Sequence, residues 1–484
     1  MIILSDHMDP DVDFYVPPGS DATEALSEAL QLGNVYGVAH IVVRGRLYLY
    51  ANGNTLFTLE QTKHYVFEGD GLGEIYYVNP NNVQNPGPVF NVGSIATTQM
   101  NYIGDVAPVI DPQFAAYSTG GWMIAFKSLR LVNQTSQRWF IITGFAGMHS
   151  LMMYFDSVEF LASIWINETT EVVVYNCYVN SNELLFDSRS RELVVFGSRF
   201  EHEAVLAMSA RGWSVVGCVF IGKNSYLNPG NDGNDGSVVG CVFDGATLIT
   251  QGATNLKVVA CQFQNVTFSG YQGSAQITLG WNYVIVGCSF IQYPLSITNL
   301  YNGHTVVVAM NNFDYGSNLV IGVCDDGYLD SLIIMGNIFT SQNYNSSLIF
   351  ITGDPQYRGS SNTINFTGQI NMLQIAFNTF TNSSNKEGVT IGIYATSNQR
   401  LHAQAYINMG ISAKYVYVSF NYFKNNDGLH DNGSGQPVGV MSIQQLGSSM
   451  PTVNYLMFYF NVNEGNPMYI PSSQSYTSQF NIGM

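Results

Sequence analysis

The stretch of sequence that decides the fold occurs twice, as Ser214–Phe220 (SVVGCVF) and unchanged as Ser237–Phe243. The anchors of the repeat recur roughly every twenty residues, with wider intervals after Phe339. A repeat of this length with insertions predicts a solenoid rather than a row of separate globular domains. Related segments end at an equivalent anchor along most of the chain: Phe160, Val179, Phe200, Phe220, Phe243, Phe263, Phe290, Phe313, Phe339, Phe380 and Phe423.

Two columns inside the repeat indicate stacked parallel strands. A β-branched residue, which suits a pleated strand, lies five positions before each later anchor: Val195, Val215, Val238, Val258, Ile285, Val308, Ile334, Ile375 and Val418. Small or amide side chains lie two positions before the anchor: Cys177, Ser198, Cys218, Cys241, Cys261, Cys288, Asn311, Asn337, Asn378 and Asn421. Stacked strands place one column in line, so thiols can fill a bend and asparagines can hydrogen-bond along the stack. The glycine that often precedes this column marks the bend.

These residues resemble the parallel β-helix repeat with its asparagine ladder, which is found in pectate-lyase-like and tailspike proteins. The head of the chain strengthens the resemblance, because Gly19–Leu30 predicts an N-capped amphipathic helix, followed by a strand at His40–Leu49 and the glycine-rich Phe67–Gly73. The resemblance implies an all-β, right-handed parallel β-helix with an N-terminal capping α-helix. It does not choose an activity, because this fold hosts lyases, hydrolases, adhesins and inert virion parts.

The organisation expected from these patterns is a segment with the capping helix at 1–33, the β-helix at 34–465 and a tail at 466–484. Long insertions are expected at about 340–372, 381–415 and 424–455. Loops of this length in a compact fold are usually functional or interfacial, so they are expected to form the recognition surface.

Composition excludes several classes of function. Only 11% of the residues are charged, the formal net charge is −17 and the pI is near 4.7. Nucleic acid and anionic membrane surfaces need clustered Lys and Arg, so neither is expected as a partner. Apolar runs are too short for a membrane helix, and the first residues lack a basic n-region, so we expect no membrane insertion and no cleavable signal peptide. An extracellular or virion location would then need another delivery route, such as lysis.

Five of the six cysteines occupy the ladder column, and Cys324 lies apart. In-register neighbours on parallel strands have poor geometry for a disulfide, so buried free thiols are expected.

The most charge-dense stretch contains Glu201 and Glu203, with arginines at positions 189, 191, 199 and 211. One interpretation is a pair of catalytic carboxylates beside a sugar-binding arginine, because glycoside hydrolysis needs an acid and a base on neighbouring elements. The other is a salt-bridged turn region in which opposite charges one coil apart neutralise each other.

A second set of candidate catalytic residues is His304 with Asp325 and Asp326. It faintly resembles the polygalacturonase set, but His304 precedes the aspartates and no Arg-x-Lys follows, so the family's roles are not transferred. Adjacent carboxylates can share a proton or hold a divalent cation, and Asp-Asp-Gly is equally an ordinary turn.

Metal binding is also suggested by the loop from Asn224 to Gly236, where Asp232 and Asp235 have the Asx and Gly spacing of calcium loops. The loop lacks the closing Glu of an EF-hand, so a plain turn is the alternative. No cofactor is expected to be required, and calcium is the one ion that the sequence suggests.

Three functions are consistent with the sequence. The first is a virion-associated, tailspike-like or fibre-like protein. It would bind a surface polysaccharide or glycoprotein, or another virion subunit, and it could assemble as a homotrimer. The second is a polysaccharide lyase or glycoside hydrolase with carboxylates on the flank of the β-helix. The third is a purely structural coat or decoration protein.

Overall fold

The computed structural model covers the chain, and its elements fall into two compact units, Met1–Asn234 and Asp235–Met484. The structure describes residues 1–60, 63–92, 122–143, 151–166, 171–186, 192–208, 212–229, 235–251, 254–265, 275–278, 282–300, 305–314, 317–323, 328–341, 349–353, 369–382, 405–409, 412–424, 439–443, 453–464 and 476–479.

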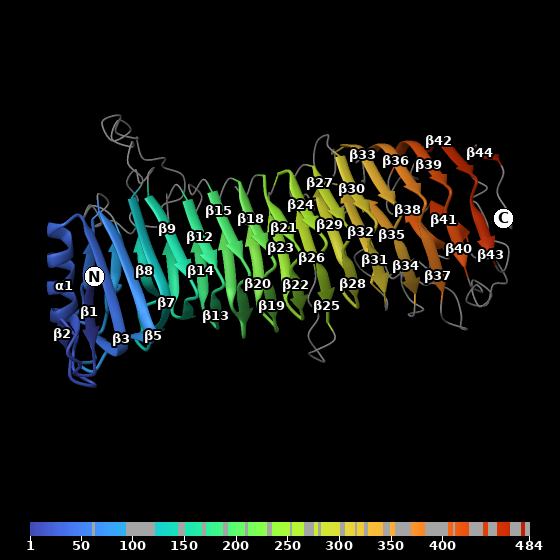
Figure 1. The fold of residues 1–484 in the computed structure, drawn as a ribbon. Coiled ribbons are helices and arrows are strands. Elements are labelled where there is room, and N and C mark those ends of the chain that lie inside the picture. Colours follow the sequence, from blue (N-terminus) through green and yellow to red (C-terminus); the bar gives the residue numbers. More distant parts are fainter. Residues whose placement is uncertain are drawn as a thin grey trace, which may run out of the picture. The chain divides into compact units, whose positions relative to one another are not determined.

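Each coil of the first unit contributes strands to two parallel sheets (Figure 1). In the later coils two consecutive strands belong to one sheet and the third belongs to the other, whereas the first coils have one long strand in place of the first two. The N-terminal elements are β1 (Ile2–Ser5), β2 (Phe14–Tyr15), α1 (Thr23–Val35), β3 (Val38–Tyr50), β4 (Phe57–Leu59), β5 (His64–Val78), β6 (Phe90–Val92), β7 (Trp122–Asn133) and β8 (Trp139–Thr143).

The remaining coils of the first unit have the three-strand pattern. Its strands are β9 (Leu151–Asp156), β10 (Glu159–Leu161), β11 (Ser163–Ile166), β12 (Glu171–Tyr175), β13 (Tyr178–Asn180), β14 (Glu183–Phe186), β15 (Glu192–Phe196), β16 (Arg199–Glu201), β17 (Val205–Met208), β18 (Trp213–Val216), β19 (Val219–Ile221) and β20 (Tyr226–Pro229).

The second unit is built in the same way, with strands that pair in parallel from coil to coil. Its strands are β21 (Ser237–Val239), β22 (Val242–Asp244), β23 (Thr247–Gln251), β24 (Leu256–Val259), β25 (Gln262–Gln264), β26 (Ala275–Thr278), β27 (Tyr283–Val286), β28 (Ser289–Ile291), β29 (Leu295–Leu300), β30 (Thr305–Ala309), β31 (Asn312–Asp314), β32 (Leu319–Val323), β33 (Tyr328–Met335), β34 (Ile338–Ser341), β35 (Ile349–Gly353), β36 (Gln369–Ala376), β37 (Thr379–Asn382), β38 (Ala405–Met409), β39 (Ser412–Ser419), β40 (Tyr422–Lys424), β41 (Gly439–Ile443), β42 (Val453–Tyr459), β43 (Val462–Glu464) and β44 (Tyr476–Gln479).

The fold is therefore a right-handed parallel β-helix with an α-helix near its N-terminus, as the repeat predicted. The expected register is confirmed within each unit: Val195 pairs with Val215, and Val258 pairs with Ile285. The anchors form a buried ladder of stacked rings, with centroids 4.8 Å apart between Phe263 and Phe290. This ladder fills the interior, because each ring covers the face of the one below it.

The column before the anchors forms the predicted polar ladder. In the second unit, Asn311 Nδ2 donates to Asn337 Oδ1 at 3.0 Å, and Asn337 Nδ2 donates to Asn378 Oδ1 at the same distance. The side chains of Asn378, Asn421 and Asn461 continue this pattern. The described ladder cysteines are free and buried, and burial raises the pKa of the Cys177 thiol to about 12. The Cys177 thiol is therefore protonated and unreactive at neutral pH.

A sharp bend precedes this polar column in every repeat. The residue at the bend has a left-handed backbone conformation, with φ of 60° at Gly197 and 67° at Gly287. Glycine adopts this conformation without steric cost, which explains the recurrent glycine. Other repeats place a side chain there, as at Ala260 and Met310, with φ of 52° and 56°.

The ends of the β-helix differ from the expected boundaries. The helix α1 ends at Val35, and β1 precedes it and pairs with β3, so the sheet already begins at Ile2. In the C-terminal segment, β44 pairs with β42. The three expected insertions lie largely outside the described residues, but each contains the third strand of its coil, namely β35, β38 or β41. The repeat did not predict these strands, because the residues on either side of them carry no anchor motif.

Candidate functional site

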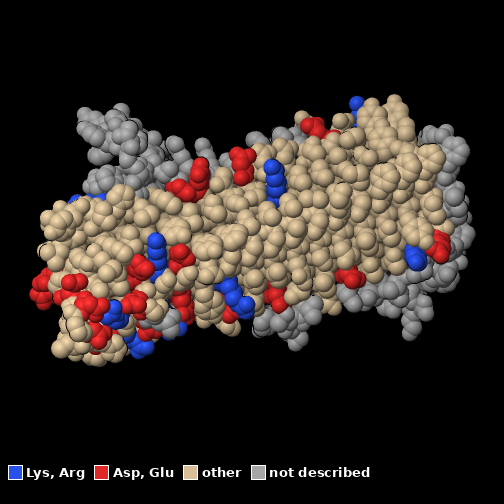
Figure 2. Space-filling model, in the orientation of Figure 1, with Lys and Arg blue, Asp and Glu red and all other residues tan. Residues whose placement is uncertain are grey.

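Charged side chains gather over the first coils, at the end where α1, β1 and β2 lie (Figure 2). Residues 1–78 contain 11 Asp and Glu but only 3 Lys and Arg. Over the whole chain only 11% of residues are charged. The first coils therefore carry a marked excess of acidic side chains.

A ladder of alternating charge runs across β3, β5, β7 and β10. Strand register places Arg46 beside Glu74, Glu74 beside Arg130, and Arg130 beside Glu159. Glu74 accepts hydrogen bonds from Arg46 Nε at 2.6 Å and Arg130 Nη1 at 2.7 Å, and only 10% of its side chain is exposed. Arg130 Nε donates to Glu159 at 2.7 Å. Paired charges of this kind can be buried because each carboxylate oxygen has a donor.

A hollow of about 300 Å³ opens beside this ladder. The guanidinium of Arg46 lies 4.6 Å from the ring centre of Tyr76, and that ring packs against Tyr48 with centroids 5.4 Å apart. The hydrogen bond with Tyr48, followed by that with Glu74, raises the pKa of Arg46, which therefore stays charged. The lining residues are Asp6, Pro18, Gly19, Gly45, Arg46, Tyr48 and Glu74.

The carboxylate of Asp6 has spare hydrogen-bonding capacity in this hollow. Its Oδ1 atom is buried and has no hydrogen-bond partner, although His7 Nε2 lies 3.5 Å away. Gly45 makes room for it, because a Cβ atom on Gly45 would lie 1.8 Å from Asp6 Oδ1. Gly45 also has φ of 76°, a conformation that favours glycine. A buried oxygen without a hydrogen bond is costly, so a donor from a ligand at this position would be favourable.

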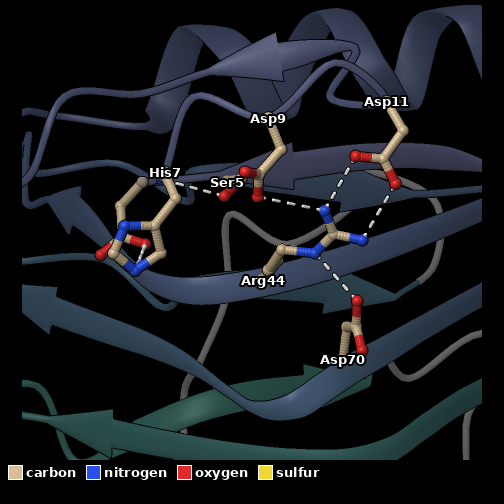
Figure 3. Close-up of polar contacts among 7 residues, drawn as sticks. Ser5, His7, Asp9, Asp11, Arg44 and Asp70 are labelled. Atoms are coloured by element: carbon tan, nitrogen blue, oxygen red, sulfur yellow. Dashed lines mark hydrogen bonds and ion pairs between the residues drawn. The ribbon is translucent and has the colours of Figure 1, made fainter.

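A second arginine holds the N-terminal segment against β3 and β5 (Figure 3). Arg44 Nη1 and Nη2 donate to the two oxygens of Asp11 at 3.0 and 3.1 Å, and Arg44 Nε donates to Asp70 at 2.9 Å. Asp9 accepts a longer contact of 3.4 Å from Nη1. This arrangement ties residues 9–11 to the strands that carry the hollow, so Arg44 is a structural clamp beside the site.

The clamp makes one pH-dependent prediction. The hydrogen bond from Arg44 holds the pKa of Asp11 below its ordinary value of 3.8. Because the folded-state pKa is depressed, the stabilisation is complete above that ordinary value and is lost as pH falls through the lowered pKa. We expect carboxyl carbon NMR to show Asp11 titrating below 3.8 in the wild type and near 3.8 in Arg44→Gln. An unchanged midpoint in the variant would contradict the clamp.

The predicted carboxylates Glu201 and Glu203 lie in an ion-paired turn of the first unit. Glu201 pairs with Arg199 and accepts a hydrogen bond from Tyr178 Oη at 2.9 Å. Burial raises the pKa of Glu201, but the hydrogen bonds from Arg199 and Tyr178 outweigh it, so the net shift is downward. A general acid needs the opposite shift. Glu203 accepts from Asn224 Nδ2 at 3.1 Å.

Of the other predicted site residues, the structure describes only Asp235. Asp235 lies at a bend with φ of 55°, and its Oδ1 accepts from Asn255 Nδ2 at 2.7 Å, as a turn residue does. Within the described ranges, no group of three or more His, Cys, Asp or Glu is arranged to hold a metal ion. The remaining candidates lie outside the described residues: Asp232, His304, Asp325 and Asp326.

The hollow was missed by the sequence reasoning, although a signal for it exists. The anchor column continues backward through Leu131, Ile75 and Leu47, which pair with one another in register. The residue before each of these anchors is Arg130, Glu74 or Arg46. These three positions alternate in charge along the column. The intervals between Leu47, Ile75 and Leu131 are unequal and longer than the repeat, so the column is hard to follow in the sequence.

Comparisons with known proteins concern the fold. No protein-family model matches the chain, and no curated protein matches its sequence. The chain is similar to tailspike protein 3 of bacteriophage CBA120, with 11% identity and a TM-score of 0.38 over 91% of this chain and 61% of that chain. It thus spans less than two thirds of that tailspike chain.

Two further solved structures are similar to the chain. The A-module of the Azotobacter vinelandii mannuronan C-5 epimerase AlgE6 has 13% identity and a TM-score of 0.35, over 96% of this chain and 95% of that one. The tailspike protein of E. coli bacteriophage HK620 has 13% identity and a TM-score of 0.32, over 99% and 78%. No helix among the described residues has the length and apolar character needed to cross a membrane.

Proposed function

We propose that this chain is a tailspike-like or fibre-like β-helix protein, on a virion or outside the cell, that binds a surface glycan in the hollow of its first coils. One observation carries the proposal. The hollow brings a tyrosine, an arginine and two carboxylates to one place, and Asp6 Oδ1 among them is buried without a hydrogen-bond partner.

This set of groups matches the chemistry of a sugar. A sugar ring has an apolar C–H face, which packs on an amphipathic aromatic ring such as Tyr48. Its hydroxyls both donate and accept, so they need carboxylate acceptors and guanidinium donors fixed nearby. Asp6 and Glu74 supply the acceptors and Arg46 supplies the donor. Strand register and ion pairing hold Arg46 and Glu74 in place before any ligand arrives.

Charge and volume favour a particular class of glycan. With 11 acidic and 3 basic residues in positions 1–78, the surroundings repel uronates and favour neutral or amino sugars. The hollow of about 300 Å³ is at the small end of ligand sites, which suits a short segment of a polysaccharide.

The proposal is tested by calorimetric titration of the full chain with oligosaccharides of neutral hexoses, amino sugars and uronates. We expect the wild type to bind a neutral or amino-sugar oligosaccharide and to ignore uronates. Tyr48→Ala should weaken that binding about tenfold, because an aromatic contact contributes about 1 kcal/mol beyond area burial.

A matched control is Tyr175→Ala. Tyr175 is an exposed tyrosine of the same unit that stacks on Phe196 and does not line the hollow. Its substitution should leave glycan affinity unchanged. Strongest binding to uronates, absence of binding to every oligosaccharide, or an equal loss in Tyr175→Ala would each overturn the proposal.

A further inference from the structure

The two carboxylates of the hollow differ in how their charges are neutralised. Glu74 accepts hydrogen bonds from both Arg46 and Arg130. Asp6 also lines the hollow, with 14% of its side chain exposed, but its Oδ1 atom is buried without a hydrogen-bond partner. Its ion-pair neighbour is His7, which is 70% exposed and charged only if protonated. Asp6 is therefore the carboxylate of the hollow that can still take a positive charge from a ligand.

The arginines of β3 beside Asp6 are already engaged. The backbone N–H of Asp6 donates to Arg44 O at 3.4 Å, but the Arg44 guanidinium is held by the clamp with Asp11. Arg46 donates to Glu74 at 2.6 Å. In the part of the chain that the structure describes, neither guanidinium forms an ion pair with Asp6. The charge of Asp6 thus stays uncompensated even though two arginines are near it in the sequence.

The charge balance around the hollow is negative as well. Acidic side chains predominate at this end of the chain (Figure 2). The clamp, the charge ladder and Asp6 together hold three arginines and six carboxylates: Arg44, Arg46, Arg130, Asp6, Asp9, Asp11, Asp70, Glu74 and Glu159. A negative potential of this kind attracts cations and repels anions. The hollow therefore favours a ligand that carries a positive charge.

The backbone fixes the carboxylate of Asp6 before any ligand binds. β1 pairs with β3 up to the contact of Ser5 with Arg44, so the next residue, Asp6, starts from a fixed position. A Cβ atom on Gly45 would lie 1.8 Å from Asp6 Oδ1, so the carboxylate packs directly on this glycine. A group held in this way loses little conformational entropy when it binds a ligand.

The other groups of the hollow indicate which kind of cation fits. A divalent metal ion needs several oxygen ligands, whereas the guanidinium of Arg46 lines the same hollow. Within the described ranges, no group of three or more potential ligands is arranged for a metal ion. An ammonium group is compact, has three donors and can be held by one carboxylate. The ring of Tyr48 and the donors of Arg46 then remain for a sugar ring and its hydroxyls.

We propose that the hollow selects a sugar with a free, protonated amine, and that Asp6 determines this preference. The inference rests on the proposed glycan site and specifies the substituent that the site recognises. The ammonium group brings a charge opposite to that of Asp6 and forms a charge-assisted hydrogen bond, which a hydroxyl cannot match. Acetylation of the amine removes its charge, so an N-acetyl sugar loses this advantage.

Calorimetric titration of the full chain with three oligosaccharides tests the preference. They are built from glucose, glucosamine or N-acetylglucosamine with the same linkage and length, so they differ at a single substituent. At pH about 6, carboxylates are ionised and aliphatic amines are protonated. We expect the glucosamine oligosaccharide to bind at least about tenfold more tightly than the glucose oligosaccharide. The N-acetyl form should show no such gain over glucose.

Three variants assign the preference to one carboxylate. Asp6→Asn retains the shape of the side chain and removes its charge, so the ratio of the two affinities should fall to within about twofold of unity. His7→Gln removes the cation that competes for Asp6 when protonated, so the ratio should be at least that of the wild type. Asp9→Asn is the matched control, because it removes a negative charge from the same segment but outside the hollow. It should keep the preference for glucosamine.

The outcomes separate this inference from the glycan site on which it rests. Equal affinity of the wild type for glucose and glucosamine oligosaccharides would overturn the inference and leave the site standing. The same holds if folded Asp6→Asn keeps the preference, or if Asp9→Asn loses it equally. If Asp6→Asn does not fold, salt decides on the wild type, because added salt should weaken glucosamine binding more than glucose binding. A preference that does not change with salt contradicts the inference, and absence of binding to all three oligosaccharides would remove the site as well.

Discussion

Asn378→Ala is expected to lower the free energy of unfolding by about 4 kcal/mol, because it removes a link from the middle of a buried hydrogen-bonded ladder. Asn378 Oδ1 accepts from the backbone N–H of Asn337 at 2.9 Å and from Asn337 Nδ2 at 3.0 Å. Asn378 Nδ2 donates to Ile334 O at 2.9 Å and to Asn421 Oδ1 at 3.0 Å. Alanine leaves these groups without partners in a site that excludes water, since Asn378 is 1% exposed.

Urea denaturation followed by circular dichroism measures this effect. The control is Asn312→Ala, which removes the same type of side chain from an outward position of β31, beside the ladder residue Asn311. We expect a change within about 0.5 kcal/mol for that variant. Equal effects of the two substitutions would show that the ladder adds nothing beyond an ordinary asparagine.

The second large effect is expected at the candidate site. Glu74→Gln should destabilise the protein by about 2 kcal/mol, because it removes the charge that Arg46 and Arg130 share. Fully buried pairs lose more on such a change, but the side chains of Arg46 and Arg130 are 45% and 32% exposed, so water partly compensates. Thermal unfolding by calorimetry measures the loss.

Glu68→Gln on the same strand is the matched control. Glu68 pairs with His40 Nε2 at 2.8 Å, but its side chain is 43% exposed. Exposed ion pairs contribute little, so we expect a change within about 0.5 kcal/mol. If Glu74→Gln is no more destabilising than Glu68→Gln, the charge ladder does not hold the first coils together.

The two candidate sites illustrate how far the sequence reaches. Glu201 and Glu203 were predicted as candidate catalytic residues because charged residues cluster there along the chain. In the structure Glu201 forms an ion pair with Arg199, and Glu203 accepts a hydrogen bond from Asn224. The hollow assembles residues that are distant in sequence, from Asp6 to Glu74. Charge density along the sequence therefore identified an ion-paired turn. The hollow could not be identified in this way, because its side chains meet only when the coils stack in register.

Phe377, Phe420 and Phe460 show what the repeat register adds. A phenylalanine in this chain is most often an interior anchor, but these three lie one residue before the asparagine column, where several earlier repeats have the glycine of the bend. Their positive φ angles and their exposure agree with that position and distinguish them from buried anchors such as Phe380 and Phe423. A displacement of three residues along the chain moves a ring from the interior to the surface, because the bend lies between the two positions.

The sequence by itself determined the repeat, the parallel β-helix, the interior phenylalanine column and the asparagine ladder. These features depend on period and on neighbours one coil apart, and both are written directly in the residue order. The hollow beside Glu74 and the clamp at Arg44 were decided only by the tertiary structure. They depend on bend angles, exposure and the unequal lengths of the connecting segments, which determine the side chains that meet in space.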